Sequence, residues 1–290
     1  MQKQGSLGIV SIVGPGLIGG SIGLGLKERK LVRRVVGVGH RDASLEKALE
    51  MHAVDHATRD LEEGVREADI VILCTSVKLI PEIAEKILPW MKAGSVLTDV
   101  GSTKEHIVEQ IRAVIRGARS PVKGVGFIGG HPLAGSEQRG IAAARPDLFQ
   151  GATCILTPPK ADRRDSRSRG IVKGMWEALG AKVKFLSPEG HDLIIAFISH
   201  LPQLVATSLV NTLRPGQLAF TARGFRDVTR IASSDPALWQ DILLQNREAL
   251  LEAITDFQKE LALVKRVLLE RDSRRLFARL KRAKGRRDSL

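Results

Sequence analysis

The chain has 290 residues, a formal net charge of +13, an ordinary share of apolar residues and only two cysteines. This length fits one large or two modest domains with ample apolar material for a core. The first residues are too polar for a signal peptide and no apolar run approaches a membrane span, so we expect a soluble cytoplasmic protein. Cys74 and Cys154 lie in apolar, strand-like runs and should be buried reduced thiols, and no metal-ligand spacing occurs.

Most of the positive charge lies at the C-terminal end of the chain. Between residues 263 and 290, eleven lysines and arginines stand against three acidic residues, which leaves +8 in this segment. Such a segment could bind nucleic acid or an acidic partner. It holds one aromatic residue, Phe277, and no stacking pattern, so a solvated helix end is favoured and a nucleic-acid partner is not expected.

The stretch from Leu7 to Lys27 predicts a dinucleotide-binding turn. An apolar strand, Ile9 to Val13, is followed by the pattern G-x-G-x-x-G and then by a helical pattern. Gly14 permits the tight turn, Gly16 lets a pyrophosphate approach the backbone, and Gly19 lets the helix pack on its strand. The pyrophosphate would lie at the helix N-terminus, where free N–H groups favour negative charge. The cofactor contacts predicted here are Gly14, Gly16, Leu17, Ile18 and Gly19.

Strands and helices then alternate, which predicts a Rossmann-type, doubly wound parallel sheet. The further strands are expected at 34–39, 54–58, 69–74, 94–100, 125–130, 152–157 and 182–185. Ligands bind such sheets at the carboxyl ends of the strands, so three stretches should meet in one crevice. These stretches are 14–19, 75–77 and 99–104, and they add Thr75, Ser76, Val77 and Asp99 to the predicted cofactor contacts.

The residues after the second strand bear on the choice between NAD and NADP. An acid at this strand end would bind the ribose hydroxyls of NAD, whereas an arginine accommodates the 2′-phosphate of NADP. The chain reads His40-Arg41-Asp42, so we predict that His40 and Arg41 contact the cofactor, with a slight preference for NADP. Asp42 could still reach a ribose, or Asp42 or Ser44 could cap the next helix.

Two polar residues follow strands at this crevice. Ser102 forms a capping box with Glu105 three residues later, and both a cap and a contact with substrate or nicotinamide stay open for it. His131 directly follows the sixth strand, amid small residues, where it cannot belong to a helical core stripe. A neutral imidazole there could accept a proton from a substrate hydroxyl while hydride leaves the same carbon.

From residue 187 onward the pattern is helical only, which predicts a dinucleotide domain at 1–186 and a helical domain at 187–290. The second domain should complete the substrate site and form a dimer. Its first long helix contains Pro202, and His200 and Gln203 share one face beside the expected kink. For His200 a hydrogen-bonded core position is nearly as well supported as a ligand-binding one.

A second polar island runs from Phe225 to Ala232. One of its arginines could bind a carboxylate through two hydrogen bonds, or the arginines could pair with Asp227 or Asp235.

Together these motifs resemble the prephenate/arogenate dehydrogenase family of tyrosine biosynthesis, from Gly8 to about Leu269. The motifs are V-G-P-G-L-I-G-G-S, T-D-V-G-S-T-K, G-G-H-P-L-A-G-S-E, S-H-L-P and F-R-D-V-T-R-I-A-S-S-D-P-x-L-W. The family combines a nucleotide domain with a helical dimerisation domain, and the resemblance implies an NAD(P)-dependent oxidative decarboxylation. Hydride leaves C4 of the cyclohexadienol for the nicotinamide, the C4 hydroxyl becomes a carbonyl, and the ring carboxylate leaves as CO2.

By motif match the resemblance also implies roles for single residues. His131 accepts the hydrogen bond or proton of the C4 hydroxyl, Ser102 helps to orient that hydroxyl, and Arg230 binds a substrate carboxylate. His200 matches the first histidine of S-H-L-P. The residues that shape the pocket by this match are Glu137, Asp227 and Trp239, of which Trp239 could reach across the dimer.

One position departs from the family pattern. Many members that use prephenate read S-H-L-P-H, whereas this chain has Gln203 in place of the second histidine. The resemblance therefore implies prephenate as substrate and leaves arogenate, or both, open. The segment after Leu269 is too short for the regulatory domain that some members carry, so tyrosine control, if present, would act at the active site.

Two other classes fit the sequence less well. A short-chain 3-hydroxyacid dehydrogenase with a similar two-domain plan uses a catalytic lysine on its helical domain, and residues 191–213 contain none. A protein that senses dinucleotides or binds nucleic acid through the basic tail would not need His131, Ser102 and Arg230.

Overall fold

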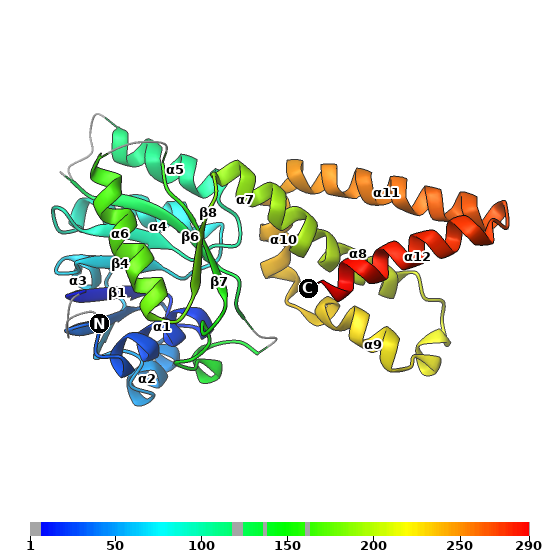
Figure 1. Cartoon of the computed structure of the whole chain (residues 1–290). Coiled ribbons are helices and arrows are strands. Elements are labelled where there is room, and N and C mark those ends of the chain that lie inside the picture. The colour runs from blue at the N-terminus through cyan, green and yellow to red at the C-terminus, as the bar shows by residue number, and fades with distance from the viewer. Residues whose placement is uncertain (1–6, 118–123, 136–137, 160–162, 290) are drawn as a thin grey trace.

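The computed structural model describes residues 7–117, 124–135, 138–159 and 163–289. Within them the N-terminal part forms one eight-stranded sheet in the order β3-β2-β1-β4-β5-β6-β7-β8 (Figure 1). Strands β1 to β6 are parallel, while β7 runs antiparallel to β6 and parallel to β8. The strands are β1 (Ile9–Val13), β2 (Arg34–Val38), β3 (His56–Thr58), β4 (Ile70–Leu73), β5 (Val96–Asp99), β6 (Gly126–Pro132), β7 (Thr153–Thr157) and β8 (Lys182–Phe185). The Rossmann-type fold is confirmed, with two reversed strands at one edge.

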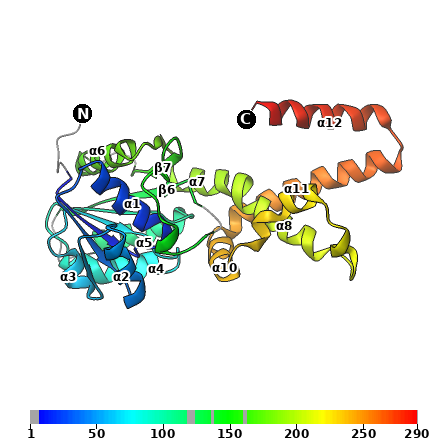
Figure 2. The ribbon, with the colours of Figure 1, turned by 90° about the horizontal axis from the view of Figure 1, so that it is seen from below.

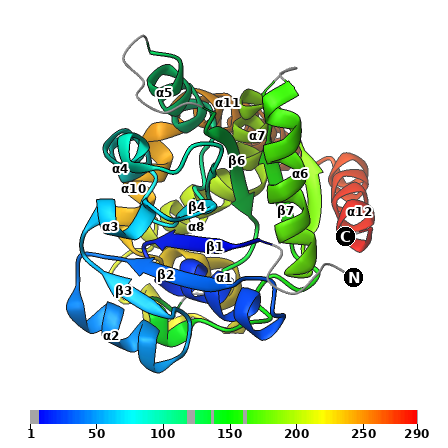
Figure 3. The same cartoon turned by 90° about the vertical axis from the view of Figure 1, so that its left-hand side faces the viewer.

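Helices cover both faces of this sheet (Figure 3). One face carries α1 (Leu17–Glu28), α2 (Asp42–Glu50) and α6 (Arg163–Ala178), and the other carries α3 (Leu61–Val65), α4 (Leu79–Ile87) and α5 (Glu105–Arg116). Fully buried side chains fill both layers, with Ile12 and Trp176 in the first and Leu73 and Ile107 in the second. Because both faces are covered, the central strands read as continuous apolar runs.

The turn between β1 and α1 has the geometry that its glycines predict. Gly14 has a φ of +92°, in the left-handed region that favours glycine. A Cβ on Gly19 would lie 2.5 Å from the carbonyl oxygen of Gly14 and 2.8 Å from Cγ2 of Ile12. Only glycine at position 19 therefore lets α1 pack this closely on β1.

From Pro188 onward the described chain is helical and extends away from the sheet (Figure 2). A long helix begins as α7 (Pro188–Ile195), passes through the π turn η3 (Ala196–His200) and continues as α8 (Leu201–Asn211). The next helices are α9 (Arg223–Thr229), α10 (Pro236–Gln245), α11 (Arg247–Leu269) and α12 (Ser273–Asp288). Short 3-10 turns are η1 (Leu88–Trp90), η2 (Ile141–Ala143), η4 (Gln217–Phe220) and η5 (Arg230–Ser233). The all-helical second part is confirmed.

Two local expectations at the sheet are corrected. Strand β6 continues through His131 and Pro132, because its pairing with antiparallel β7 extends beyond its pairing with β5. The N-cap residue of α2 is Arg41, and no side chain caps this helix, so neither Asp42 nor Ser44 has the capping role.

The expectation about membrane spans is also corrected. The helix Pro188–Asn211 has 24 residues and a mean hydropathy of 1.8 in its most apolar window, enough to cross a membrane by length and composition alone. Only 28% of that window is buried within the chain. Exposed apolar side chains recur close to helical periodicity at Leu193, Ile194, Phe197 and Ile198. This helix therefore presents an apolar face that the described residues do not cover.

Candidate active site

A pocket of about 710 Å³ opens at the carboxyl ends of β1, β2 and β4. Its lining includes six of the predicted cofactor contacts, namely Gly14, Gly16, His40, Arg41, Thr75 and Ser76. A Cβ on Gly16 would meet no atom within 4 Å, so the backbone there is open to a ligand. The hydroxyl of Thr75 is enclosed and has no hydrogen-bond partner among the described residues. An open glycine turn beside an unpaired hydroxyl fits a dinucleotide.

The other predicted cofactor contacts do not line this pocket. Leu17 and Ile18 pack partly buried against the core, Gly19 lies at the contact between α1 and β1, and Val77 is buried. These four residues support the fold around the pocket.

Asp99 is fully buried, as is Lys104, with which it forms an ion pair. The Asp99 carboxylate also accepts the backbone N–H of Gly101 at 2.8 Å and that of Gly130 at 3.2 Å. These bonds of the carboxylate all go to the protein, and the cofactor contact of Asp99 stays a prediction.

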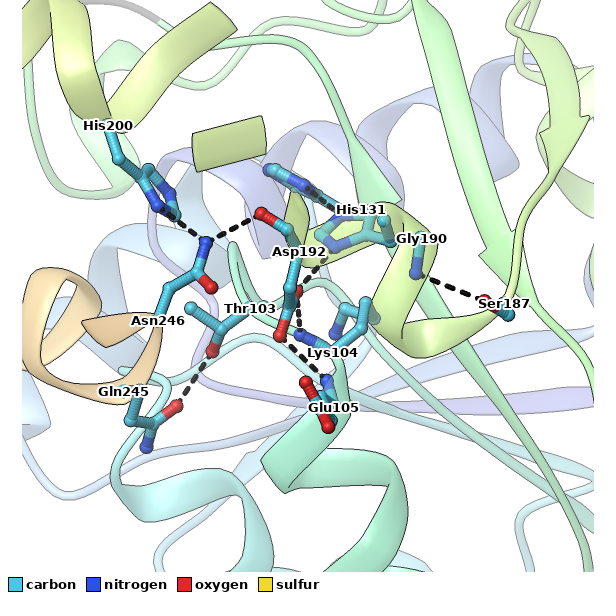
Figure 4. A network of polar contacts seen from close by, with 12 residues as sticks. Thr103, Lys104, Glu105, His131, Ser187, Gly190, Asp192, His200, Gln245 and Asn246 are labelled. Carbon is cyan, nitrogen blue, oxygen red and sulfur yellow. Dashed lines mark hydrogen bonds and ion pairs between the residues drawn. The ribbon is translucent and has the colours of Figure 1, made fainter. Parts of the chain in front are cut away.

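His131 is linked to a carboxylate through a second histidine (Figure 4). Its Nδ1 lies 2.9 Å from Nε2 of His191, whose Nδ1 lies 2.7 Å from Oδ1 of Asp192. An ionised carboxylate only accepts hydrogen bonds, so Nδ1 of His191 donates and its Nε2 is left to accept from Nδ1–H of His131. The Nε2 of His131 then carries a free lone pair and can act as a base.

The environment of the two histidines keeps them uncharged. Burial lowers the pKa of His131 well below its ordinary value, and the positive charge of Lys104 lowers it further. Burial also lowers the pKa of His191, against the bond to Asp192, which raises it. Both imidazoles are therefore neutral at neutral pH, as the bonding pattern requires.

The same aspartate replaces the predicted capping box of α5. Helix α5 has Lys104 as its N-cap residue, without a side-chain cap of its own. Asp192 accepts the backbone N–H of Lys104 at 2.7 Å and that of Glu105 at 2.9 Å. Because a carboxylate is a stronger acceptor than a hydroxyl, this bond from α7 takes the role predicted for Ser102. Ser102 lies half-buried in the loop before the helix, without a direct bond to His131 in the described part of the chain.

His191 and Asp192 are functional candidates that the sequence motifs did not identify. The available signal was an adjacent His-Asp pair in the first turn of a helix capped by Ser187. Nothing in that pair indicates that it meets a strand end 60 residues earlier in the chain.

A second cluster surrounds His200 and Gln203, which are 1% and 4% exposed. The His200 ring stands edge-on to Trp239 of the same chain, with 5.9 Å between the centroids and 86° between the planes. Burial is the main cause that lowers the pKa of His200 to about 4. The Nε2 of His200 and Oε1 of Gln203 are enclosed without a partner among the described residues. Such atoms are costly unless a ligand pairs with them.

The remaining predicted substrate residues lie farther along the helical part. Arg230 is exposed at the start of η5, which packs against α8. Asp227 is exposed on α9 and pairs with Arg223, with 3.5 Å between Nε and Oδ2. Asp235 caps α10 and pairs with Arg139. Glu137 lies outside the described residues.

Family models match both parts of the chain. The model described as prephenate dehydrogenase, nucleotide-binding domain, matches residues 22–185, and that described as prephenate dehydrogenase, dimerization domain, matches residues 187–282. The chain belongs to the prephenate dehydrogenase family. Membership makes it an oxidoreductase that uses a nicotinamide dinucleotide.

Other members of the prephenate dehydrogenase family cover nearly the whole chain. A prephenate dehydrogenase of Bacillus subtilis is 36% identical over 97% of this chain and 76% of its own length. A cyclohexadienyl dehydrogenase of Zymomonas mobilis is 30% identical over 97% of this chain and 95% of its own length. The Aquifex aeolicus prephenate dehydrogenase in complex with hydroxyphenyl propionate and NAD+ has a TM-score of 0.89 and 32% identity, covering 100% and 99% of the two chains.

Proposed function

We propose that this member of the family converts prephenate to 4-hydroxyphenylpyruvate by oxidative decarboxylation in tyrosine synthesis. The proposal rests above all on the hydrogen-bonded series His131–His191–Asp192, which leaves a free lone pair on the neutral imidazole of His131. A bound nicotinamide ring supplies the hydride acceptor. As hydride leaves C4 of the substrate, Nε2 of His131 takes the proton of the C4 hydroxyl, and the charge that forms is stabilised through His191 by Asp192. Ser102, as the resemblance implies, helps to orient that hydroxyl.

The substrate's polar groups are assigned to the helical part. His200, Gln203 and Trp239 are assigned to the substrate by motif match and by their shared cluster, and Arg230 binds a carboxylate through its guanidinium. Glu137 and Asp227 remain proposals by motif match alone. The unpaired Oε1 of Gln203 can accept a hydrogen bond from an ammonium group, which favours arogenate as a second substrate.

Initial rates test this function directly. Purified protein is given prephenate or arogenate with NADP or NAD, and the reduced nicotinamide is followed by its absorbance. We expect turnover of prephenate, and turnover of arogenate if Gln203 accepts the ammonium. Absence of turnover in all four pairings would contradict the enzymatic assignment.

For the cofactor we propose a preference for NADP. Arg41, Ser44 and Arg59 all line the ribose end of the pocket, whereas Asp42 does not. Asp42 is instead paired with Arg59, with 3.1 Å between Oδ2 and Nη1. Arg59 therefore engages the acid that could have favoured NAD, and the guanidinium groups of Arg41 and Arg59 both line the pocket in which a 2′-phosphate would bind.

Replacing either arginine should weaken NADP binding selectively. Arg41→Ala and Arg59→Ala are each expected to raise the Kd of NADP by about 10- to 100-fold, the effect of one charge-assisted hydrogen bond. The Kd of NAD should not rise in either variant. Titration calorimetry without substrate measures both constants, with Arg66→Ala as the control, because Arg66 pairs with Glu62 outside the pocket. Equal losses for both cofactors would contradict the proposed preference.

We infer a cytoplasmic homodimer whose contact lies in the helical domain, with the domain boundary between residues 186 and 187. The match to a dimerization domain supports the dimer. The uncovered apolar face of the α7–α8 helix supports it as well, because burial against a second protomer removes that face from water. The basic end of the chain is not assigned a nucleic-acid partner.

A further inference from the structure

We propose that Asn246 is a positioning residue that holds His200 as a hydrogen-bond donor toward the substrate. Asn246 lies between α10 and α11, is 4% exposed, and belongs to none of the motifs that carry the family resemblance. The inference rests on the proposed function only in taking His200 as a substrate-binding residue.

The side chain of Asn246 touches two groups on the α7–η3 helix (Figure 4). Its Nδ2 lies 2.8 Å from the carbonyl oxygen of Asp192 and 3.0 Å from Nδ1 of His200. A carbonyl oxygen can only accept, so the amide atom that faces it must be the nitrogen; the reversed amide would bring two oxygens to 2.8 Å. One N–H of Asn246 is thereby directed to Asp192 and the other to His200.

This bonding determines which nitrogen of His200 carries the proton. The ring is neutral, because burial lowers its pKa to about 4. A neutral imidazole has one donor and one acceptor nitrogen, and Nδ1 accepts from Asn246, so Nε2 carries the hydrogen. That N–H is enclosed without a partner in the described part of the chain. It is therefore suited to an oxygen of the substrate, either a carboxylate or a keto group.

The two histidines of the site consequently have opposite functions, and both depend on Asp192. Its side chain, acting through His191, leaves an acceptor on His131. Its backbone oxygen, acting through Asn246, leaves a donor on His200. One residue thus prepares a base for the hydroxyl that reacts and a donor for an oxygen that does not.

Nitrogen-15 NMR of the histidine rings in the full chain tests the assignment without any turnover. In the unaltered protein we expect Nδ1 of His200 to be unprotonated, with the signals assigned by their loss in His200→Gln. In Asn246→Asp, a carboxylate that only accepts should leave Nδ1 of His200 protonated. Asn211→Asp makes the same change at the chain's only other asparagine, which is exposed at the end of α8, and should leave the His200 signals in place. A protonated Nδ1 in the unaltered protein would overturn the proposal.

Ligand binding supplies the second readout. Asn246→Leu removes the bond to His200 without adding charge, and it should raise the Kd of hydroxyphenylpropionate by about tenfold while the Kd of NADP stays unchanged. An unchanged Kd for hydroxyphenylpropionate would also overturn the proposal. If His200 shows the expected tautomer but neither prephenate nor arogenate is turned over, the proposed function fails and the positioning by Asn246 stands.

Discussion

His131→Gln is expected to lower kcat by about 10²- to 10⁴-fold, the usual contribution of a general base. Glutamine keeps a polar side chain of similar reach but has no basic nitrogen to take the proton of the C4 hydroxyl. The Kd of NADP should change little, because His131 does not line the cofactor pocket. His106→Gln is the matched control, since His106 is exposed on α5. A His131→Gln protein that keeps more than a tenth of kcat would contradict the assigned base.

The pH profile checks the same residue independently. Burial places the pKa of His131 well below its ordinary value of 6.5, so the neutral, basic form persists when the solution is mildly acidic. As pH falls, kcat/KM should stay level down to 6.5 and decline only below that, when Nε2 takes up a proton. An acidic decline that begins above pH 6.5 would contradict this protonation state.

Lys104→Met is expected to lower the free energy of unfolding by about 3–5 kcal/mol, a large part of the roughly 5–15 kcal/mol typical of a folded protein. Methionine fills a similar volume but leaves the Asp99 carboxylate charged and buried, with two backbone N–H groups as its partners among the described residues. Urea unfolding of the full chain measures the change. Lys47→Met removes an ion pair to Glu50 that is exposed on α2 and should cost less than about 1 kcal/mol. An equal loss of unfolding free energy in the two variants would contradict the larger contribution expected of the buried Lys104–Asp99 pair.

Features that depend on local geometry could be predicted from the sequence. The turn Gly14–Gly19 is determined by backbone conformation and close packing within a few residues, and the structure shows both. The alternation of strands and helices likewise indicated the order of elements. The residues of β7 and β8 did not indicate that these strands run opposite to the others. The direction of a strand depends on how the chain re-enters the sheet, which its own residues do not determine.

Features that depend on contacts between distant segments could not be predicted. The capping box at Ser102 satisfied a local rule, but it did not account for a carboxylate that arrives from α7. Asp99 satisfied the rule for ligands at strand ends, yet Lys104 follows closely enough to turn back and pair with it. At α5 a carboxylate replaces the predicted hydroxyl cap, and at Asp99 a lysine pairs with the carboxylate that was predicted to contact the ligand. Only the packed structure identifies these charged partners.

The π turn between α7 and α8 bears on how this helix responds to a change in its length. A π turn holds one residue more than an α-helical turn, so η3 is equivalent to a single inserted residue. The wider turn takes up this residue, so α8 keeps the orientation that it would have after an unbroken α-helix one residue shorter. Asp192 and His200 both reach Asn246 across this turn. A one-codon deletion within η3 is therefore expected to restore a continuous α-helix, and it is the change in length that this helix accommodates best.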